Sequence, residues 1–302
     1  MTLPPRQRAL TGSYALVDGI PFSMPVNSLD SPALMAGFTV DYDQASALIP
    51  GEEIMLVRLP RGRALLVITV IHYRTTDIGR YVEFSIAFAC YHRRAGRRVV
   101  RTLMAERTSA VGQFVWDLPV SSLVSVKGGK GIWGMPKHQA NLDFDVADDE
   151  MSSQYDLDGE LCMRITVKRP KRLKVPLRDV AATNYCQFRG MLMKSSVFFS
   201  DNAEIAVGKF ANATLMLGAH PRMAPLAGLK RSESPIFAAC LPHSHGVLDD
   251  HYEAWFLTSS APPDSDQPPE GLESVVELPN SEEWLPPPTA EGRRSRVPTA
   301  NR

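Results

Sequence analysis

The sequence of 302 residues has few cysteines, no net charge and no long hydrophobic run. Its cysteines stand too far apart to form a Cys-x-x-Cys pair, which excludes a disulfide-rich scaffold and predicts reduced core thiols at Cys90, Cys162, Cys186 and Cys240. The longest strongly apolar run, residues 64–71, is far shorter than a membrane span. The 33 Lys and Arg residues balance the 33 Asp and Glu residues, which argues against a nucleic-acid or anionic membrane partner.

The sequence also gives no targeting or metal-binding pattern. No apolar stretch follows the prolines and arginines of residues 1–10, so no secretory signal is expected and a cytoplasmic protein is predicted. His243, His245 and His251 are interpreted as polar loop residues, since a His-x-His pair with scattered neighbours is a poor ligand set. We therefore expect no metal site.

The composition changes sharply near residue 261. Nine of the 24 prolines follow Ala261, together with eight acidic and four basic residues, and apolar residues become scarce. Such a composition does not bury enough apolar surface to recover the entropy of ordering. The sequence predicts one folded domain over residues 1–260 and a Pro-rich, acidic, disordered tail over residues 261–302.

Strand signals dominate the predicted domain. Runs rich in Val, Ile, Phe and Tyr, bounded by Gly, Pro and Asp, predict strands at 54–59, 64–73, 81–91, 99–104, 142–146 and 161–167. One short helix is expected over 42–48, with Asp41 or Asp43 as its N-cap and Pro50 after its end. The pattern is typical of an α+β fold built mainly from antiparallel strands.

Two segments in the centre of the chain contain lysine. Lys127-Gly-Gly-Lys-Gly131 lacks the ending of a phosphate-binding loop and is interpreted as a glycine-rich turn between strands. In Trp133-Gly-Met-Pro-Lys137, the proline fixes the backbone ahead of the lysine, and Trp133 and Met135 supply apolar surroundings that disfavour an ammonium ion. A lysine in such surroundings is either a neutral nucleophile or, as is common after proline, a solvated turn residue.

The order of motifs along residues 20–257 resembles the acetoacetate decarboxylase family. The motifs are Pro25 with segment 41–50, Gly79-Arg-Tyr-Val-Glu83, Trp133-Gly-Met-Pro-Lys-His138 and Gly218-Ala-His-Pro-Arg-Met-Ala-Pro-Leu226. The resemblance implies a large cone-like or barrel sheet that encloses the active site, with short peripheral helices at its edges. It also implies a homo-oligomer.

The resemblance further implies a Schiff-base lyase acting on a small-molecule keto acid. Lys137 matches the lysine that forms an iminium with a β-keto acid, and the iminium accepts the electrons released as carbon dioxide leaves. No cofactor is then needed, because the lysine itself provides the electron sink. Glu83 matches an active-site glutamate that holds substrate or shuttles a proton. Four neighbours are expected to tune the lysine pKa or bind substrate: His138, Trp133, Met135 and Tyr81.

The chain departs from the family pattern at three polar positions. His138 stands where the decarboxylase has a second lysine, the apolar segment near Ile68 replaces a second glutamate, and no arginine lies between Pro25 and Asp41. An aldolase or dehydratase that uses the same lysine on a larger keto acid is therefore an alternative. So is an inactive binding relative with an exposed Lys137. Four arginines are candidates for a replacement carboxylate anchor: Arg58, Arg74, Arg80 and Arg189.

Overall fold

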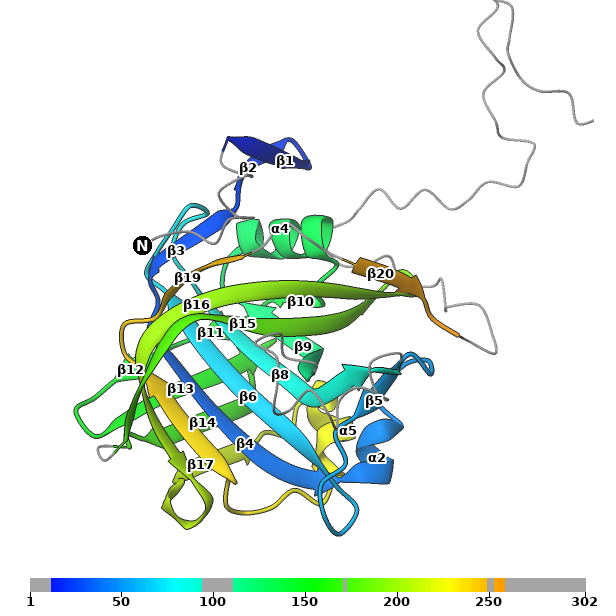
Figure 1. Ribbon diagram of the computed structural model, residues 1–302, viewed down its shortest axis with the longest axis vertical. Coiled ribbons are helices and arrows are strands. Elements are labelled where there is room, and N and C mark those ends of the chain that lie inside the picture. The colour runs from blue at the N-terminus through cyan, green and yellow to red at the C-terminus, as the bar shows by residue number, and fades with distance from the viewer. Residues whose placement is uncertain (1–11, 94–110, 171–172, 249–252, 259–302) are drawn as a thin grey trace, which may run out of the picture.

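The computed structural model describes residues 12–93, 111–170, 173–248 and 253–258. The predicted strand over 99–104 and the predicted tail over 261–302 lie outside these residues. Figure 1 shows the described elements as one strand-rich body.

Seven strands close into a barrel, as the predicted fold class requires. In order around the ring they are β9 (Gly112–Val120), β8 (Tyr81–His92), β6 (Arg63–Tyr73), β4 (Ala33–Asp41), β18 (Phe237–Leu241), β16 (Met191–Val207) and β15 (Lys174–Phe188). All neighbouring pairs are antiparallel except β15 and β9, whose short parallel pairing at Asn184 and Tyr185 closes the ring. Closure removes the exposed edges that an open sheet would present.

Short strands extend this sheet outside the ring. They are β3 (Val26–Asp30), β5 (Ile54–Leu56), β7 (Thr75–Thr76), β10 (Lys137–Gln139), β19 (His245–Leu248) and β20 (Glu253–Phe256). The hairpin of β1 (Ser13–Val17) and β2 (Ile20–Met24) forms a separate two-stranded sheet. The predicted strands 64–73 and 81–91 match β6 and β8 closely, whereas the predicted strand 54–59 ends at Leu56.

A second, smaller sheet packs against the barrel. It contains β11 (Asn141–Leu142), β12 (Asp145–Val146), β13 (Glu150–Leu157), β14 (Glu160–Lys168) and β17 (Ala213–Leu217). Its inward side chains Tyr155 and Ile165 belong to the same buried cluster as Phe38 and Phe84 of the barrel. The two sheets therefore share one hydrophobic core.

The described helices are short and lie at the periphery. The predicted helix at 42–48 is α2 (Tyr42–Ser46), capped as expected by Asp41, whose Oδ1 accepts from the Gln44 amide at 3.0 Å. The others are α4 (Leu123–Trp133), α5 (Ala224–Ala227) and the 3-10 helices η2 (Gly208–Phe210) and η3 (Pro221–Met223). Within the described residues, no helix is long and apolar enough to span a membrane.

The prediction of a glycine-rich turn over Lys127–Gly131 is wrong, because these residues lie inside α4. Glycine in a helix costs about 1 kcal/mol relative to alanine, so intrinsic preference does not favour this helix. Close packing compensates for it. A Cβ atom on Gly128 would lie 2.6 Å from the Phe22 ring, and one on Gly131 would lie 2.5 Å from Val17. The helix ends at Gly134, which adopts a left-handed conformation.

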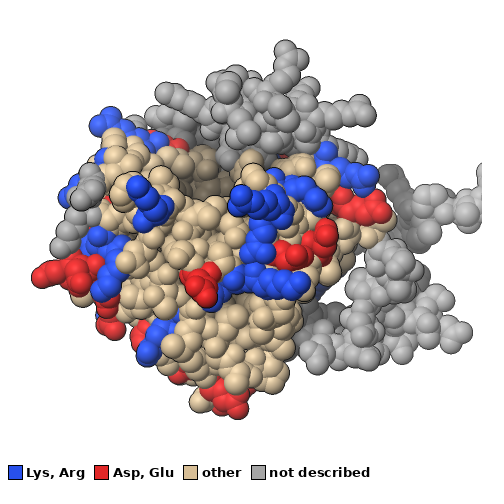
Figure 2. Space-filling view, turned by 90° about the horizontal axis from the view of Figure 1, so that it is seen from below, with Lys and Arg blue, Asp and Glu red and all other residues tan. Residues whose placement is uncertain are grey.

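The cysteines and the surface charges match the composition. All four cysteines are free and buried, as predicted, and burial raises the pKa of the Cys186 thiol to about 12. Figure 2 shows basic and acidic side chains interspersed on the face of the molecule seen from below. That face carries no extended field of a single sign.

Candidate active site

Strand register brings Lys137 and Glu83 to the same face of the sheet. Strand β9 lies between β10 and β8, with Lys137 opposite Leu118 and Glu83 opposite Val120. Cross-strand partners share a face, and residues two apart on one strand do so as well. The two charged side chains therefore meet over β9, where Lys137 Nζ lies 2.7 Å from Glu83 Oε2.

The Lys137 amine is enclosed by polar and aromatic groups. Its side chain is 4% exposed, and that of Glu83 is 14% exposed. The amine also donates to Ser125 Oγ of α4 at 2.9 Å and lies 5.4 Å from the centre of the Tyr81 ring. The alternative in which Lys137 is an exposed turn residue is therefore contradicted.

Two tyrosines flank the ion pair as neutral groups. Tyr73 and Tyr81 stack with ring centres 4.5 Å apart, and the Tyr73 hydroxyl lies 3.5 Å from Glu83 Oε1. Burial raises the pKa of both phenols well above the usual value, and the charge of Glu83 raises it further. Both hydroxyls therefore remain protonated and available as donors.

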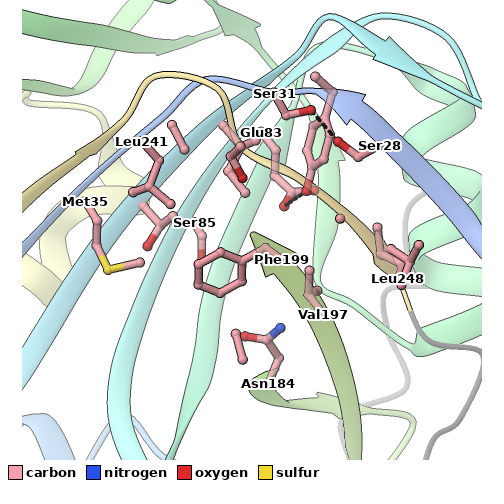
Figure 3. A pocket seen from close by; sticks show the side chains of 18 of the residues that line it. Ser28, Ser31, Met35, Glu83, Ser85, Asn184, Val197, Phe199, Leu241 and Leu248 are labelled. Carbon is pink, nitrogen blue, oxygen red and sulfur yellow. Dashed lines mark hydrogen bonds between the residues drawn. The ribbon is translucent and has the colours of Figure 1, made fainter. Parts of the chain in front are cut away.

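The ion pair lies where two chambers adjoin. The lysine chamber, about 50 Å³, is walled by Lys137, Trp133, Met135, Val115 and Leu118. The distal chamber, about 120 Å³, is walled by Met35, Thr69, Phe199, Leu241 and others from the barrel interior. Both chambers share a middle wall made of Tyr73, Glu83, Ser85, Asn184, Val197 and Leu248. Figure 3 shows the distal chamber with Glu83 and Ser85 projecting into it from one side.

His138 lies on the opposite face of β10 and lines neither chamber. Its Nε2 lies 3.0 Å from Asp117 Oδ1, and Arg222 of η3 donates to the same carboxylate at 2.8 and 3.1 Å. Burial alone would raise the pKa of Asp117, but the hydrogen bonds from His138 and Arg222 outweigh it, so the pKa is lowered. The expected role of His138 at the substrate is therefore replaced by a structural contact behind the lysine.

The segment near Ile68, where the family pattern has a second glutamate, lies on β6 beside the distal chamber. Ile68 is fully buried and belongs to the main core, on the side of β6 that faces away from the chambers. Its neighbour Thr69 lines the distal chamber and pairs with Ser85 of β8. Hydroxyl groups thus occupy the wall next to Glu83.

The four arginines considered as carboxylate anchors all lie elsewhere. Arg58 contacts Asp43 at 3.6 Å, and Arg74 contacts Asp30 at 3.7 Å. Arg80 donates to His72 at 3.0 Å, and Arg189 lies over the Phe188 ring. None of these arginines lines either chamber.

Two site residues on α4 escaped sequence reasoning. Ser125 accepts from Lys137, and Gly129 leaves room for the lysine stem, because a Cβ atom there would lie 2.3 Å from Lys137 Cδ. The signal in the sequence that could have revealed Gly129 was the three glycines within 128–131, because glycine is found where another part of the chain packs closely against the backbone as well as in turns. Within the described residues, no group of three or more His, Cys, Asp or Glu side chains is placed to hold a metal ion.

We predict that Gly129→Ala displaces the lysine without unfolding the protein. The new methyl group overlaps the lysine stem, and the flexible stem moves more easily than the helix. A crystal structure of the variant should show Lys137 Nζ and Glu83 Oε2 separated by more than about 4 Å, the limit of an ion pair. Gly228→Ala is the matched control, since its Cβ atom meets nothing within 4 Å. An unchanged ion pair in Gly129→Ala would contradict this account of the glycine.

We predict that Asp117→Asn lowers the free energy of unfolding at neutral pH by about 1–3 kcal/mol, because the hydrogen bonds with His138 and Arg222 lose their charged acceptor. The folded pKa of Asp117 lies below its ordinary value near about 3.9, so its stabilisation is complete above that value. It is lost as the pH falls through the folded pKa. The free energy of unfolding, measured with urea between neutral and acid pH, should therefore fall less steeply toward acid pH in Asp117→Asn than in the parent protein.

The exposed Asp43→Asn is the control for this titration, because that side chain is 90% exposed. It should reproduce the free energy of unfolding of the parent protein and the steepness with which that free energy falls toward acid pH. Equal acid slopes in Asp117→Asn and the parent would show that Asp117 does not carry the titration.

Comparisons with known proteins agree with this architecture. A comparison with curated protein sequences gave no match. Acetoacetate decarboxylase from Legionella pneumophila is 16% identical, with a TM-score of 0.51, over 78% of this chain and 89% of that one. A second structure, from structural studies of acetoacetate decarboxylase, is 16% identical, with a TM-score of 0.56, over 77% of this chain and 90% of that one. The enduracididine biosynthesis enzyme MppR, complexed with pyruvate, is 15% identical, with a TM-score of 0.52, over 76% of this chain and 90% of that one.

At these identities the structural likeness supports the fold alone. The sequence comparison with protein families goes further. The model of the acetoacetate decarboxylase family matches residues 9–194, which is more than half of the chain and includes both Glu83 and Lys137. The chain therefore belongs to the acetoacetate decarboxylase family.

Proposed function

We propose that this protein is a Schiff-base-forming carbon–carbon lyase that decarboxylates a β-keto acid through an iminium on Lys137. The observation that carries the proposal is the buried pair of Lys137 Nζ and Glu83 Oε2, 2.7 Å apart, where the two chambers adjoin. An amine with a carboxylate at hydrogen-bond distance has the two groups that imine formation requires, a nucleophile and a proton carrier.

The first steps exchange protons within this pair. Transfer of a proton from Lys137 to Glu83 leaves a neutral amine, which attacks the substrate ketone to give a carbinolamine. Glu83 then returns the proton to the carbinolamine oxygen, water leaves, and a protonated imine remains. Tyr73, held neutral by burial, lies close enough to Glu83 to steady the carboxylate during the exchange.

The iminium then accepts electrons from the bond that breaks. Carbon dioxide leaves, the bonding pair moves into the imine system, and an enamine forms. One proton, taken up from water through the partly exposed Glu83, is delivered to the enamine carbon. Water adds to the resulting iminium and releases the ketone and the protonated amine of Lys137, which restores the starting ion pair with Glu83. The sum is a β-keto carboxylate and a proton converted into a ketone and carbon dioxide.

The charge of the chambers favours decarboxylation over an aldol reaction of pyruvate. Lys137 is the one basic residue among the described residues that line either chamber. A pyruvate aldol retains its carboxylate throughout, whereas decarboxylation converts the carboxylate into neutral products. A site without a second cation therefore stabilises the decarboxylation products relative to the charged ground state.

We predict that borohydride reduction in the presence of acetoacetate adds the mass of the reduced substrate or product to the peptide that carries Lys137. Lys137→Ala should abolish this adduct and lower enzyme-dependent release of carbon dioxide to the background rate. Lys168→Ala is the control, since Lys168 is half exposed, contacts Asp149 and Glu150, and lines neither chamber. An adduct of unchanged yield in Lys137→Ala would disprove the assignment.

We also predict that Glu83→Gln lowers kcat by about 10²–10⁴-fold, because the amide keeps the shape of the side chain but does not take up and release a proton as a carboxyl group does. Trapping of the imine should continue more slowly, since Lys137 is still present. Steady-state release of carbon dioxide and single-turnover trapping measure the two effects separately. Rates equal to those of the parent would exclude Glu83 as the proton carrier.

A further inference from the structure

We infer that the substrate extends from its ketone into the distal chamber as an uncharged, mainly aliphatic chain of about three to five carbons. This inference rests on the proposed function, and it adds the class of keto acid that the site takes. Four observations carry it: the charge of the walls, the position of Glu83, the apolar side chains and the volume.

The two chambers carry no net charge from their described walls. Lys137 and Glu83 form an ion pair with each other, and no other Lys, Arg, His, Asp or Glu is found among the described lining residues. The remaining polar groups of the distal chamber are hydroxyls and amides, from Ser28, Ser31, Thr69, Ser85, Gln113, Asn184 and Ser244. Such groups form hydrogen bonds with a ligand but supply no charge that would balance a second carboxylate.

A charged group on the far end of the substrate would be costly here. It would leave water for a space with no cation of its own to pair with, and a buried unpaired charge is strongly unfavourable. A carboxylate would also lie in the same chamber as Glu83, which is a like charge. The distal chamber therefore selects against a second carboxylate.

Across the sheet from β8 to β4, each row of lining residues begins with a polar side chain and ends with an apolar one. The first row across the sheet is Glu83, Ile71 and Ala33, and the second is Ser85, Thr69 and Met35. All six residues line the chamber. Phe199 and Leu241, both labelled in Figure 3, also line the chamber. A substrate whose ketone meets Lys137 thus passes Glu83 and reaches an aliphatic wall.

The volume sets the length of this chain. A cavity of about 150 Å³ accommodates benzene, so the distal chamber of about 120 Å³ accommodates a group slightly smaller than that. Acetoacetate, whose ketone bears only a methyl group, would leave most of the chamber unfilled.

Three substrates test the inference on the unmodified protein: acetoacetate, β-ketohexanoate and β-ketoadipate. The second and third have the same chain length, and only the third has a distal carboxylate. We expect kcat/KM for β-ketohexanoate to exceed that for acetoacetate by about tenfold or more, because additional methylene groups are buried. It should exceed that for β-ketoadipate by about a hundredfold or more. Rates with Lys137→Ala are subtracted, since β-keto acids also decarboxylate unaided.

A charge introduced into the wall provides an independent test. Met35→Lys, a change of similar length in the middle of the aliphatic wall, should shift the ratio of kcat/KM for β-ketoadipate over β-ketohexanoate upward by at least about tenfold. Met35→Leu is the matched control and should retain the preference of the parent. Circular dichroism establishes that each variant is folded; should Met35→Lys not fold, the substrate series on the parent decides alone.

The outcomes separate the inference from the proposed function. Failure to trap an imine on Lys137 with any of the three keto acids would overturn the function. Trapping of all three with a preference for β-ketoadipate or acetoacetate would leave the function in place and overturn the inference. A preference for β-ketohexanoate over β-ketoadipate that Met35→Lys weakens by about tenfold or more, and that Met35→Leu leaves unchanged, supports both.

Discussion

The ion pair between Lys137 and Glu83 is the interaction on which the rest of the site depends. Neither charge is stable alone inside a barrel, because removing one partner leaves the other buried and unpaired. Each also needs further hydrogen bonds, which Ser125 provides to the amine and Tyr73 to the carboxylate. The pair therefore requires strands β8 and β10 to flank β9 in one register, and helix α4 to lie directly over the lysine.

Strand β9 separates this pair from a second buried charge. Leu118 faces the lysine chamber, and its neighbour Asp117 faces the opposite side, where His138 and Arg222 bind it. Lys137 and His138, which are adjacent in β10, point to opposite faces for the same reason, since successive side chains of a strand alternate between the two faces. The contact with Arg222, 105 residues further along the chain than Asp117, ties η3 to β9, the strand that pairs with the lysine strand β10. It gives the motif at 218–226 a structural role behind the site.

Local patterns in the sequence were sufficient for some strands but not for the whole ring, since β4, β9, β15, β16 and β18 were not predicted. Runs rich in β-branched and aromatic residues predicted β6 and β8 within a residue at each end, and Asp41 was one of two candidates for the helix cap that it forms. The residues around Lys137 left its role open, and the family resemblance assigned it. The family resemblance supplied Glu83. Helix α4 could not be predicted in this way, because its glycines lower its intrinsic stability and its packing against Phe22 and Lys137 involves distant parts of the chain.

Long-range polar contacts were also hidden from the sequence. Nothing near Asp117 indicates that its partners are His138 and Arg222, which lie 21 and 105 residues further along the chain. Strand alternation explains why His138 could not act at the substrate: a residue adjacent to Lys137 in a strand must face the other side. The same rule shows why the position near Ile68 was the wrong place to look for a polar group, and why Thr69 lines the chamber.

The polar positions at which the chain departs from the family pattern can be explained together by the charge of the chamber walls. An additional arginine or lysine would give the site a net positive charge and hold a substrate carboxylate in place. Without one, the charges of Lys137 and Glu83 balance, and the carboxylate of a bound β-keto acid has only the transient iminium as its partner. Loss of carbon dioxide removes both of these charges together. For the proposed reaction, a neutral chamber therefore disfavours the charged intermediate more than the enamine that follows it, and this lowers the barrier between them.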